Sequence, residues 1–492
     1  MEEDLIKQRL KKLEELKKSG INPYPYSFDK KDDSSNLLEE FKILKSDEKA
    51  KRKVSIAGRI IALRDMGKAS FGHIQDAKGK IQFYIKEEEV GEKGYKILKL
   101  SDIGDVIGIK GYVFKTKTGE VTVRSESYEL LSKGIRPLPE KWHGLKDVEI
   151  RYRKRYLDLI MNRDVKKVFE TRAKIIDIIR NYLKKNEFIE VEIPTLQSIY
   201  GGASAQPFKT HLNALNIDLF LSISPELYLK RLIVGGFERV FTICKNFRNE
   251  GIDRQHNPEF TMLEFYYAYQ NYEKLISMTE ELFSILVKDI CVNKKVEYQG
   301  KTIDFTTPFK RITFRDLVLK ESGIDIDKAK DFKSLKEAIK NKNLKNVQVN
   351  NCRHYGDLLD ELYKRVCRPN IIQPTLLTHY PVEMIALAKR NEKDPRKINT
   401  FQLVIDGAEI VKAYDELNDP IDQKERLIEQ QRLLQEGAEG AMPLDEDFIY
   451  ALEVGMAPTA GYGLGIDRLT MLLTNSSSIR DVIVFPFMKP EK

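Results

Sequence analysis

The sequence contains little cysteine and no long hydrophobic run, and each shortage excludes a class of protein. Its four cysteines are far apart in the 492 residues, and no two of them form a Cys-x-x-Cys pair: Cys244, Cys291, Cys352 and Cys367. This spacing argues against a disulfide framework and against a cysteine zinc site. No apolar run approaches the ~18 residues of a membrane span, so we expect no membrane partner.

The N-terminal residues 1–5 lack both the basic start and the apolar stretch of a signal or transit peptide. We therefore expect a cytoplasmic protein with reduced thiols. Lysine and arginine number 83 against 75 aspartates and glutamates, a formal net charge of +8. This basic balance is compatible with a polyanionic partner, although lysine-rich surfaces are also simply solvated.

A typical domain has ~150 residues, so the length predicts two or three domains. Residues 1–52 open with leucines at helical spacing, which predicts an amphipathic helix and a lead-in. Residues 53–135 hold five short strand-like segments, and in the third Ile81, Phe83 and Ile85 alternate with polar residues. Five short strands favour a small β-barrel of the OB-fold type, whose exposed face commonly binds oligonucleotides.

We expect residues 136–164 to form a basic linker. It contains the run 151–156 (Arg-Tyr-Arg-Lys-Arg-Tyr). This run is either a charged connector or a direct RNA contact. Residues 165–185 then carry apolar side chains at helical spacing, followed by a strand that ends at Pro194. Residues 271–400 mix helical patterns with polar stretches, and we interpret them as a helical insertion between core strands.

The most informative segment places ionic groups on what reads as a buried hairpin. With period two, four residues of its second strand share one face: Phe260, Met262, Glu264 and Tyr266. A carboxylate thus lies among aromatic and apolar neighbours. Arg248 and Glu250 share a face at the end of the preceding strand, and a guanidinium suits a phosphate or carboxylate. The alternative is an Arg–Glu ion pair on a sheet.

Gly461, Gly463 and Gly465 alternate along a strand that leads into a helix with Arg468 in its first turn. The glycines let a ligand approach the backbone, and the helix N-terminus favours an anion, so a phosphate-bearing ligand is one interpretation. Ordinary tight turns are the other. Glu409 and Glu416 lie on a nearby hairpin and could hold Mg²⁺. Their odd separation requires a bulge, and two independent surface glutamates are the alternative.

These segments together resemble the class II aminoacyl-tRNA synthetases. The string Phe-Arg-Asn-Glu at 247–250, with His-Asn-Pro-Glu-Phe-Thr-Met-Leu-Glu at 256–264, resembles motif 2 in the form found in lysyl-tRNA synthetases of subclass IIb. Gly-Ile-Asp-Arg at 465–468 resembles motif 3, and the helix and strand of 165–194 resemble motif 1, which implies a homodimer. The resemblance implies an α+β multidomain fold: an N-terminal OB-fold barrel, then a class II catalytic domain at 165–492 on an antiparallel sheet flanked by helices.

The resemblance also implies roles for individual residues. Catalysis would rest on Arg248 and Arg468, and ATP, as co-substrate with Mg²⁺, on Arg248, Glu250, His256, Phe260 and Arg468. Lysine would be bound by Gly202, Glu226, Arg248, Glu264, Tyr266 and Asn418. Glu409 and Glu416 match the metal ligands. Gln206 stands where the family pattern leads us to expect arginine.

In the barrel, Phe71, Gln82 and Glu120 resemble anticodon-reading residues, an aromatic that stacks on a base and polar groups that read its edge. An exposed phenylalanine at a strand start is otherwise more often part of a core. The implied partner is tRNA(Lys), with a uridine-rich anticodon. The expected reaction is ATP-dependent ligation of L-lysine to this tRNA through a lysyl-adenylate.

Two other functions compete with this one. An aspartyl- or asparaginyl-type enzyme would share the barrel and the motifs, but Glu264 and the Glu-Leu-Asn-Asp segment at 416–419 argue against it. An RNA-binding protein that keeps the shape without catalysis would have lost the ATP-contacting arginines or the carboxylates. Arg248, Arg468, Glu409 and Glu416 are all present.

Overall fold

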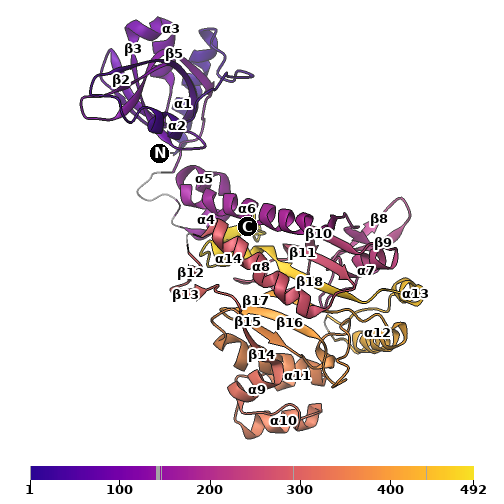
Figure 1. Ribbon diagram of the computed structural model, residues 1–492. Helices are drawn as coiled ribbons and strands as arrows, with labels where there is room; N and C mark the ends of the chain where they lie inside the picture. The colour runs from indigo at the N-terminus through magenta and orange to yellow at the C-terminus, as the bar shows by residue number, and fades with distance from the viewer. Residues whose placement is uncertain (1, 140–144, 146, 292, 439, 492) are drawn as a thin grey trace. The chain divides into compact units, whose positions relative to one another are not determined.

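The computed structural model describes residues 2–139, 145, 147–291, 293–438 and 440–491. The chain divides into two compact units, Met1–Lys146 and Asp147–Lys492 (Figure 1). The division falls inside the predicted basic linker, of which residues 140–144 and 146 lie outside the described ones. Within the described residues, every helix is too short or too polar to cross a bilayer.

The first unit is built on five strands that close into a barrel in the order β1-β2-β3-β5-β4. Only β3 and β5 pair in parallel. Ile81, Phe83 and Ile85 are buried inside the barrel, whereas Gln82 and Tyr84 face outward, so the predicted alternation and barrel are confirmed. The strands are β1 (Lys49–Asp65), β2 (Ala69–Gln75), β3 (Lys80–Lys86), β4 (Val106–Lys115) and β5 (Val121–Ser132).

Helices α1 (Glu2–Lys18), α2 (Ser34–Glu40) and α3 (Glu87–Leu100) accompany the barrel. The predicted leading helix, α1, is held by Arg9, whose guanidinium donates to the carbonyls of Ile103 at 2.9 Å and Gly134 at 3.0 Å. The sequence pattern does not indicate α3. Gly91, at a φ of 71°, interrupts its apolar repeat.

The basic run 151–156 belongs to the second unit, where it forms parts of α4 (Val148–Arg153) and α5 (Arg155–Met161). Arg155 is only 1% exposed and pairs with Asp158 at 2.8 Å. It also donates to the carbonyls of Arg480 and Val484. Arg155 therefore anchors the connector to the C-terminal segment and is not a direct RNA contact.

The second unit is built on an eight-stranded sheet in the order β14-β15-β16-β17-β18-β11-β10-β6. The pairs are antiparallel except at the two edges, where β14 runs parallel to β15 and β6 to β10. The predicted α+β class is confirmed with this refinement. The strands are β6 (Ile189–Glu190), β10 (Arg239–Phe247), β11 (Glu259–Ala268), β14 (Lys310–Thr313), β15 (Thr375–Thr378), β16 (Thr400–Ile405), β17 (Ala408–Asp415) and β18 (Thr459–Gly465).

One face of the sheet packs against α6 (Arg163–Lys185), α8 (Tyr272–Ile290) and α14 (Ile466–Leu473), and Figure 1 shows α8 lying across the strands. Leu263 and Phe265 of β11 are buried in this layer. Their neighbours along β11 point to the opposite face, where a cavity opens. Two buried layers thus hold the strands that carry the site.

The segment 271–400 is not the purely helical insertion that its sequence predicts. Besides helices, it contains a hairpin of β12 (Lys295–Tyr298) and β13 (Lys301–Asp304), and it supplies two strands, β14 and β15, to the main sheet. The last two strands have four residues each, too short for a period-two pattern to stand out among polar neighbours. The segment also includes α9 (Phe314–Ser322), α10 (Phe332–Asn341) and α11 (Tyr355–Leu362).

Candidate active site

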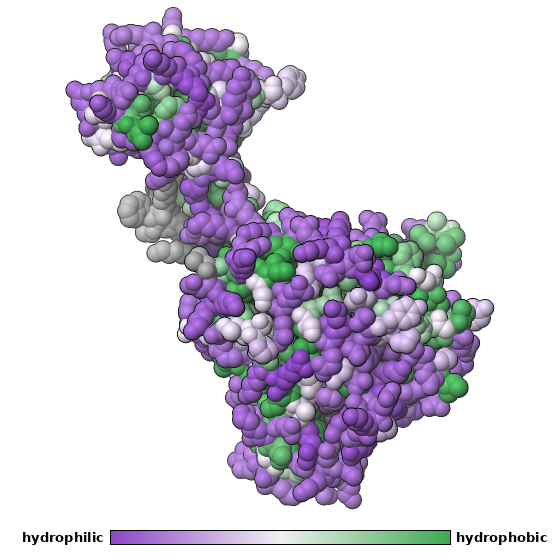
Figure 2. Space-filling model, in the orientation of Figure 1, coloured by the Kyte–Doolittle hydropathy of each residue, from purple (hydrophilic) through white to green (hydrophobic). Residues whose placement is uncertain are grey.

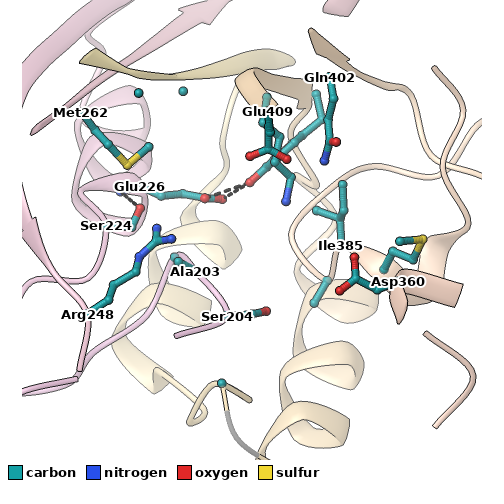
Figure 3. Close-up of a pocket in the computed structure, with 18 of the residues that line it drawn as sticks. Ala203, Ser204, Ser224, Glu226, Arg248, Met262, Asp360, Ile385, Gln402 and Glu409 are labelled. Carbon is teal, nitrogen blue, oxygen red and sulfur yellow. Dashed lines mark hydrogen bonds between the residues drawn. The ribbon is translucent and has the colours of Figure 1, made fainter. Parts of the chain in front are cut away.

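The predicted hairpin is formed by β10 and β11, with Thr242 opposite Glu264 and Asn246 opposite Phe260. Four residues of β11 line a cavity of about 530 Å³, as their spacing predicts: Phe260, Met262, Glu264 and Tyr266. Figure 3 shows Arg248 and Glu226 reaching into this cavity from one side, with Glu409 and Gln402 on the other. The ionic groups of the hairpin therefore share one concave site.

The glycines of β18 form the floor of the cavity. Gly461, Gly463 and Gly465 lie between β11 and β17, whereas the residues between them pack on the helical layer. A Cβ added at Gly461 would collide with Glu416 and Tyr266. The alternating glycines thus leave room for a ligand between side chains of the neighbouring strands, which an ordinary tight turn would not require.

One end of the cavity presents two arginines. Arg248 donates to the carbonyl of Ile223 through Nε and NH2, and its guanidinium lies 5.0 Å from the ring centre of Phe260. Arg468 donates to the carbonyl of Glu409 at 3.0 Å. Burial lowers the pKa of both guanidiniums, opposed by nearby carboxylates, but arginine keeps its charge in proteins. Among the described residues Arg248 does not form the Arg–Glu ion pair that was the alternative interpretation.

His256 lies beside Arg468, with Nε2 at 3.1 Å from NH2 of the arginine. Its Nδ1 lies 2.8 Å from Asp253, which holds the ring in place. Glu250 also lines the cavity. The structure therefore brings together all five residues predicted to bind ATP: Arg248, Glu250, His256, Phe260 and Arg468.

The other end is a buried acidic cluster with a single buried cation. Glu226, Glu264 and Glu416 are 4, 5 and 1% exposed, and Lys230 is fully buried among them. Lys230 pairs with Glu226 at 2.7 Å and also with Glu416. Tyr414 donates to Glu226 at 2.8 Å. Lys230 thus pairs with two of the three carboxylates. Glu264 has no ion pair among the described residues, although the nearby charge of Arg248 favours its ionised form.

Burial and neighbouring charges shift the pKa values of two carboxyl groups in the cluster. Burial, reinforced by Glu226, raises the pKa of Glu264 to about 8, against the weaker opposing effects of the Ser224 hydrogen bond, the charge of Arg248 and the Tyr266 hydrogen bond. Burial also raises the pKa of Glu416 well above its ordinary value, although Lys230 opposes the shift. The raised pKa favours the protonated form of Glu264 near neutral pH, whereas the sequence suggested an ionised carboxylate.

Glu416 belongs to this cluster, and Glu409 lines the same cavity. A bulge in β17 lies between them, as a shared metal site requires, because Leu403 pairs with Val411 and Val404 with Glu409. Both carboxylate oxygens of Glu416 are buried without a hydrogen-bond partner among the described residues, although one of them forms an ion pair with Lys230. The shared metal site stays a prediction.

The described residues contain no larger cluster of metal-binding side chains. No group of three or more histidine, cysteine, aspartate or glutamate side chains among them is arranged to hold a metal ion. Glu409 itself stays at the phosphate end, where its carbonyl accepts from Arg468. It is the single member of the predicted pair on this side of the cavity.

Of the remaining predicted residues, Gly202 lines the cavity and Asn418 does not. Gly202 has a φ of 83°, and a Cβ there would lie 2.9 Å from the Cβ of Glu226. Asn418 instead donates to the carbonyl of Met456 and accepts from Lys389. The structure thus does not bring Asn418 to the predicted amino-acid site.

Sequence reasoning missed several residues that line the cavity. Lys412 and Tyr414 could have been found, because they precede Glu416 on β17 with period two. Tyr363, Arg368 and Tyr380 come from the segment 271–400, whose sequence gives no signal for a cavity wall. Tyr363 begins a turn of π-helix, a feature found often at functional sites.

The barrel gathers its three predicted residues on the outer face. Gln82 donates to Glu120 at 2.7 Å, and His73 lies 2.9 Å from the same carboxylate. The ring of Phe71 is 4.5 Å from that of Tyr84, and Phe71 is outside the buried core. The interpretation of Phe71 as a core residue is therefore excluded.

Comparison with known proteins identifies the class to which this fold and this site belong. Residues 147–489 match the model of the tRNA synthetases class II (D, K and N), and residues 54–131 match the OB-fold nucleic acid binding domain. The first match covers more than half of the chain. The chain therefore belongs to the class II tRNA synthetases of the D, K and N family.

Curated relatives extend the similarity over the whole chain. A lysine–tRNA ligase of Pelotomaculum thermopropionicum is 49% identical over 489 residues, which cover 99% of this chain and 96% of the relative. The lysine–tRNA ligase of Carboxydothermus hydrogenoformans is 48% identical, with 99% and 98% covered. That of Thermotoga maritima is 46% identical, with 100% and 97% covered.

Proposed function

We propose that this protein is an ATP-dependent ligase that attaches L-lysine to tRNA(Lys) through a lysyl-adenylate. Family membership and the curated relatives support the class of reaction. The acidic cluster carries the choice of amino acid, because Glu264 has no ammonium partner among the described residues and a ligand ammonium would supply one. The side chain of lysine carries that group, whereas aspartate would bring a further acidic group beside Glu226 and Glu264.

In the proposed first step, a carboxylate oxygen of lysine attacks the α-phosphorus of ATP. The new C–O–P bond forms as the bond to pyrophosphate breaks, and pyrophosphate leaves with the electron pair. Arg248 and Arg468 offset the charge on the phosphoryl oxygens, so positioning and electrostatics supply most of the rate. No side-chain nucleophile is required. In the second step a ribose hydroxyl of tRNA attacks the carbonyl and AMP leaves.

Glu264 and Tyr266 distinguish lysine from neutral amino acids in this proposal. Arrival of the ammonium favours ionised Glu264, which then accepts a charge-assisted hydrogen bond of roughly 1.5–3 kcal/mol. A neutral amino acid of similar size brings no ammonium to pair with Glu264. Glu226 and Gly202 lie within reach of the same ligand.

Magnesium would enter with ATP and neutralise part of its phosphate charge. Glu409 and Glu416, which both line the cavity, would hold the ion, and the carboxylate oxygens of Glu416 are buried without a hydrogen-bond partner among the described residues. Glu409 remains a neighbour of the phosphate-binding arginines.

The barrel is proposed to read the anticodon. Phe71, with Tyr84 beside it, offers a stacking surface, and the linked side chains of Gln82 and Glu120 offer donors and acceptors to a base edge. The site of lysine activation lies in the other unit. The proposal includes a cytoplasmic location, where tRNA, ATP and lysine meet.

A homodimer through the motif 1 region is also proposed. Its support is a set of exposed apolar side chains near the edge strand β6: Ile189 at 52%, Leu196 at 51%, and Leu215 at 67% exposed. Leu215 lies in the hairpin of β8 (Lys209–Leu212) and β9 (Ile217–Leu221), over which hydrophobic residues gather in Figure 2. Such a surface is typical of an interface between subunits. Sedimentation of the purified protein tests it.

Amino-acid-dependent exchange of pyrophosphate into ATP tests the main proposal. The purified protein should support exchange with lysine and not with aspartate or asparagine. Exchange with aspartate alone would assign the protein to the aspartyl type. Absence of exchange with all amino acids, together with retained tRNA binding, would instead indicate an RNA-binding protein without catalysis.

A further inference from the structure

Lys412 occupies a central position in the cavity that the mechanism above leaves unused. Across the sheet it pairs with Gly463, which in turn pairs with Glu264, and on its other side it pairs with Gln402. Tyr414, two residues further along β17, points into the cavity and donates to Glu226. By period two, the side chain of Lys412 lies on the same face, and Lys412 lines the cavity.

The floor glycines give the position of Lys412 along the ligand. Tyr266 and Tyr414 flank Gly461, at the end with the acidic cluster. Gly465 is the N-cap of the helix that carries Arg468, at the phosphate end. Gly463 lies between the two and pairs with Glu264 on one side and with Lys412 on the other. Lys412 is therefore level with Glu264 and one floor glycine away from the phosphate end.

The charge of Lys412 is available to a ligand. Within the described ranges its ammonium has no hydrogen bond or ion pair to another residue. The other lysine that lines the cavity, Lys364, pairs with Asp360, and Lys230 behind the wall pairs with two glutamates. A cavity-lining ammonium without a protein partner calls for an anionic ligand group.

We propose that Lys412 binds the anionic junction at which the amino-acid carboxylate meets the α-phosphate, which deepens the function proposed above and rests on it. The carboxylate and the phosphate each carry negative charge and repel one another as they approach. An ammonium between them offsets this repulsion while the C–O–P bond forms and pyrophosphate departs. Lys412 thus supplies positive charge at this point from the protein itself.

The test replaces the ammonium by an apolar group of similar length, Lys412→Met. We expect kcat/KM for lysine-dependent pyrophosphate exchange to fall about tenfold to a hundredfold, the range of one charge-assisted bond at about 1.4 kcal/mol per tenfold. Affinity for a sulfamoyl analogue of lysyl-adenylate, measured by calorimetry, should fall similarly. Affinity for ATP without lysine should change less than threefold, because the junction is then incomplete.

Two further variants separate charge from fold. Lys412→Arg keeps the charge and should restore at least part of the lost activity. Lys301→Met is the control. It removes an exposed lysine that pairs with Asp406, a residue of the turn between β16 and β17, and it should leave pyrophosphate exchange unchanged. Equal melting temperatures for these proteins and the parent exclude unfolding as the cause of any loss.

The outcomes distinguish this inference from the function on which it rests. Lysine-dependent exchange by the parent, with Lys412→Met equally active and equally able to bind the analogue, would overturn the role of Lys412 and leave the function intact. A parent protein without lysine-dependent exchange would overturn the function itself. A Lys412→Met loss confined to ATP binding would also contradict the proposal.

Discussion

The two ends of the cavity hold their charges in different ways. At the phosphate end, Arg248 and Arg468 donate to main-chain carbonyls, which position the guanidiniums without neutralising them. At the amino-acid end, Glu226 and Glu416 share the ammonium of Lys230, whereas Glu264 accepts hydrogen bonds from Ser224 and Tyr266 only. The first end is therefore ready for an anion before it arrives. The second end becomes fully charged only when a cation enters.

The largest effect on activity should come from a substitution at the phosphate end. Arg248→Ala should lower the rate of pyrophosphate exchange roughly 100-fold to 1000-fold, the usual cost of removing a donor aimed at developing charge. Lysine binding without ATP should change far less. Arg315→Ala, which removes an arginine paired with Asp325 elsewhere, is the control. A drop of less than tenfold would show that Arg248 is not central to phosphate stabilisation.

A smaller effect on activity is expected from a substitution at the amino-acid end. Glu264→Gln should raise the KM for lysine about tenfold to a hundredfold, because it removes one charge-assisted bond, and should leave the KM for ATP within about twofold. Glu259→Gln, on the same strand but exposed and paired with Lys245, should leave both unchanged. Equal increases in the two KM values would remove Glu264 from amino-acid selection.

A change in the barrel should leave both ends intact. Phe71→Ala should weaken aminoacylation of tRNA roughly fivefold to a hundredfold, the range for loss of one base stack, while pyrophosphate exchange stays at the parent rate. Tyr26→Ala removes a fully exposed aromatic of the same unit as a control. Loss of exchange as well would contradict a barrel that acts only on tRNA.

The smallest effect concerns pH. Because Glu264 has a pKa of about 8 in the empty cavity, part of the lysine affinity is spent on removing its proton at lower pH. Affinity should therefore rise as pH increases from 6.5 toward 8 and then level off. Titration calorimetry checks this, and Glu264→Gln should flatten the dependence. An affinity that falls over this range in the parent would contradict the shifted pKa.

The sequence predicted those parts of the fold and site that depend on local periodicity. Alternation alone placed Phe260, Met262, Glu264 and Tyr266 on one face, and it found the barrel strands. It also showed that Glu409 and Glu416 need a bulge between them to share one face, and β17 has that bulge. Their role as metal ligands came from the resemblance and stays a prediction.

Other parts of the site depend on long-range contacts that no local pattern reveals. Lys230 is buried beside Glu416 although the two are far apart in sequence, and nothing in its own helix distinguishes it from a surface lysine. The strands β14 and β15 are too short to be recognised, so the cavity wall that follows them was missed. The raised pKa of Glu264 likewise arises from Glu226 and burial together.

The number of protons released when lysine binds tests the account most directly. Calorimetric titrations at pH 7 in buffers of different ionisation enthalpy give this number without catalysis. The account predicts the release of close to one proton per site, as Glu264 ionises to receive the ammonium, and its loss in Glu264→Gln. Binding of lysine without proton release in the parent protein would contradict the claim that the incoming cation completes the acidic cluster.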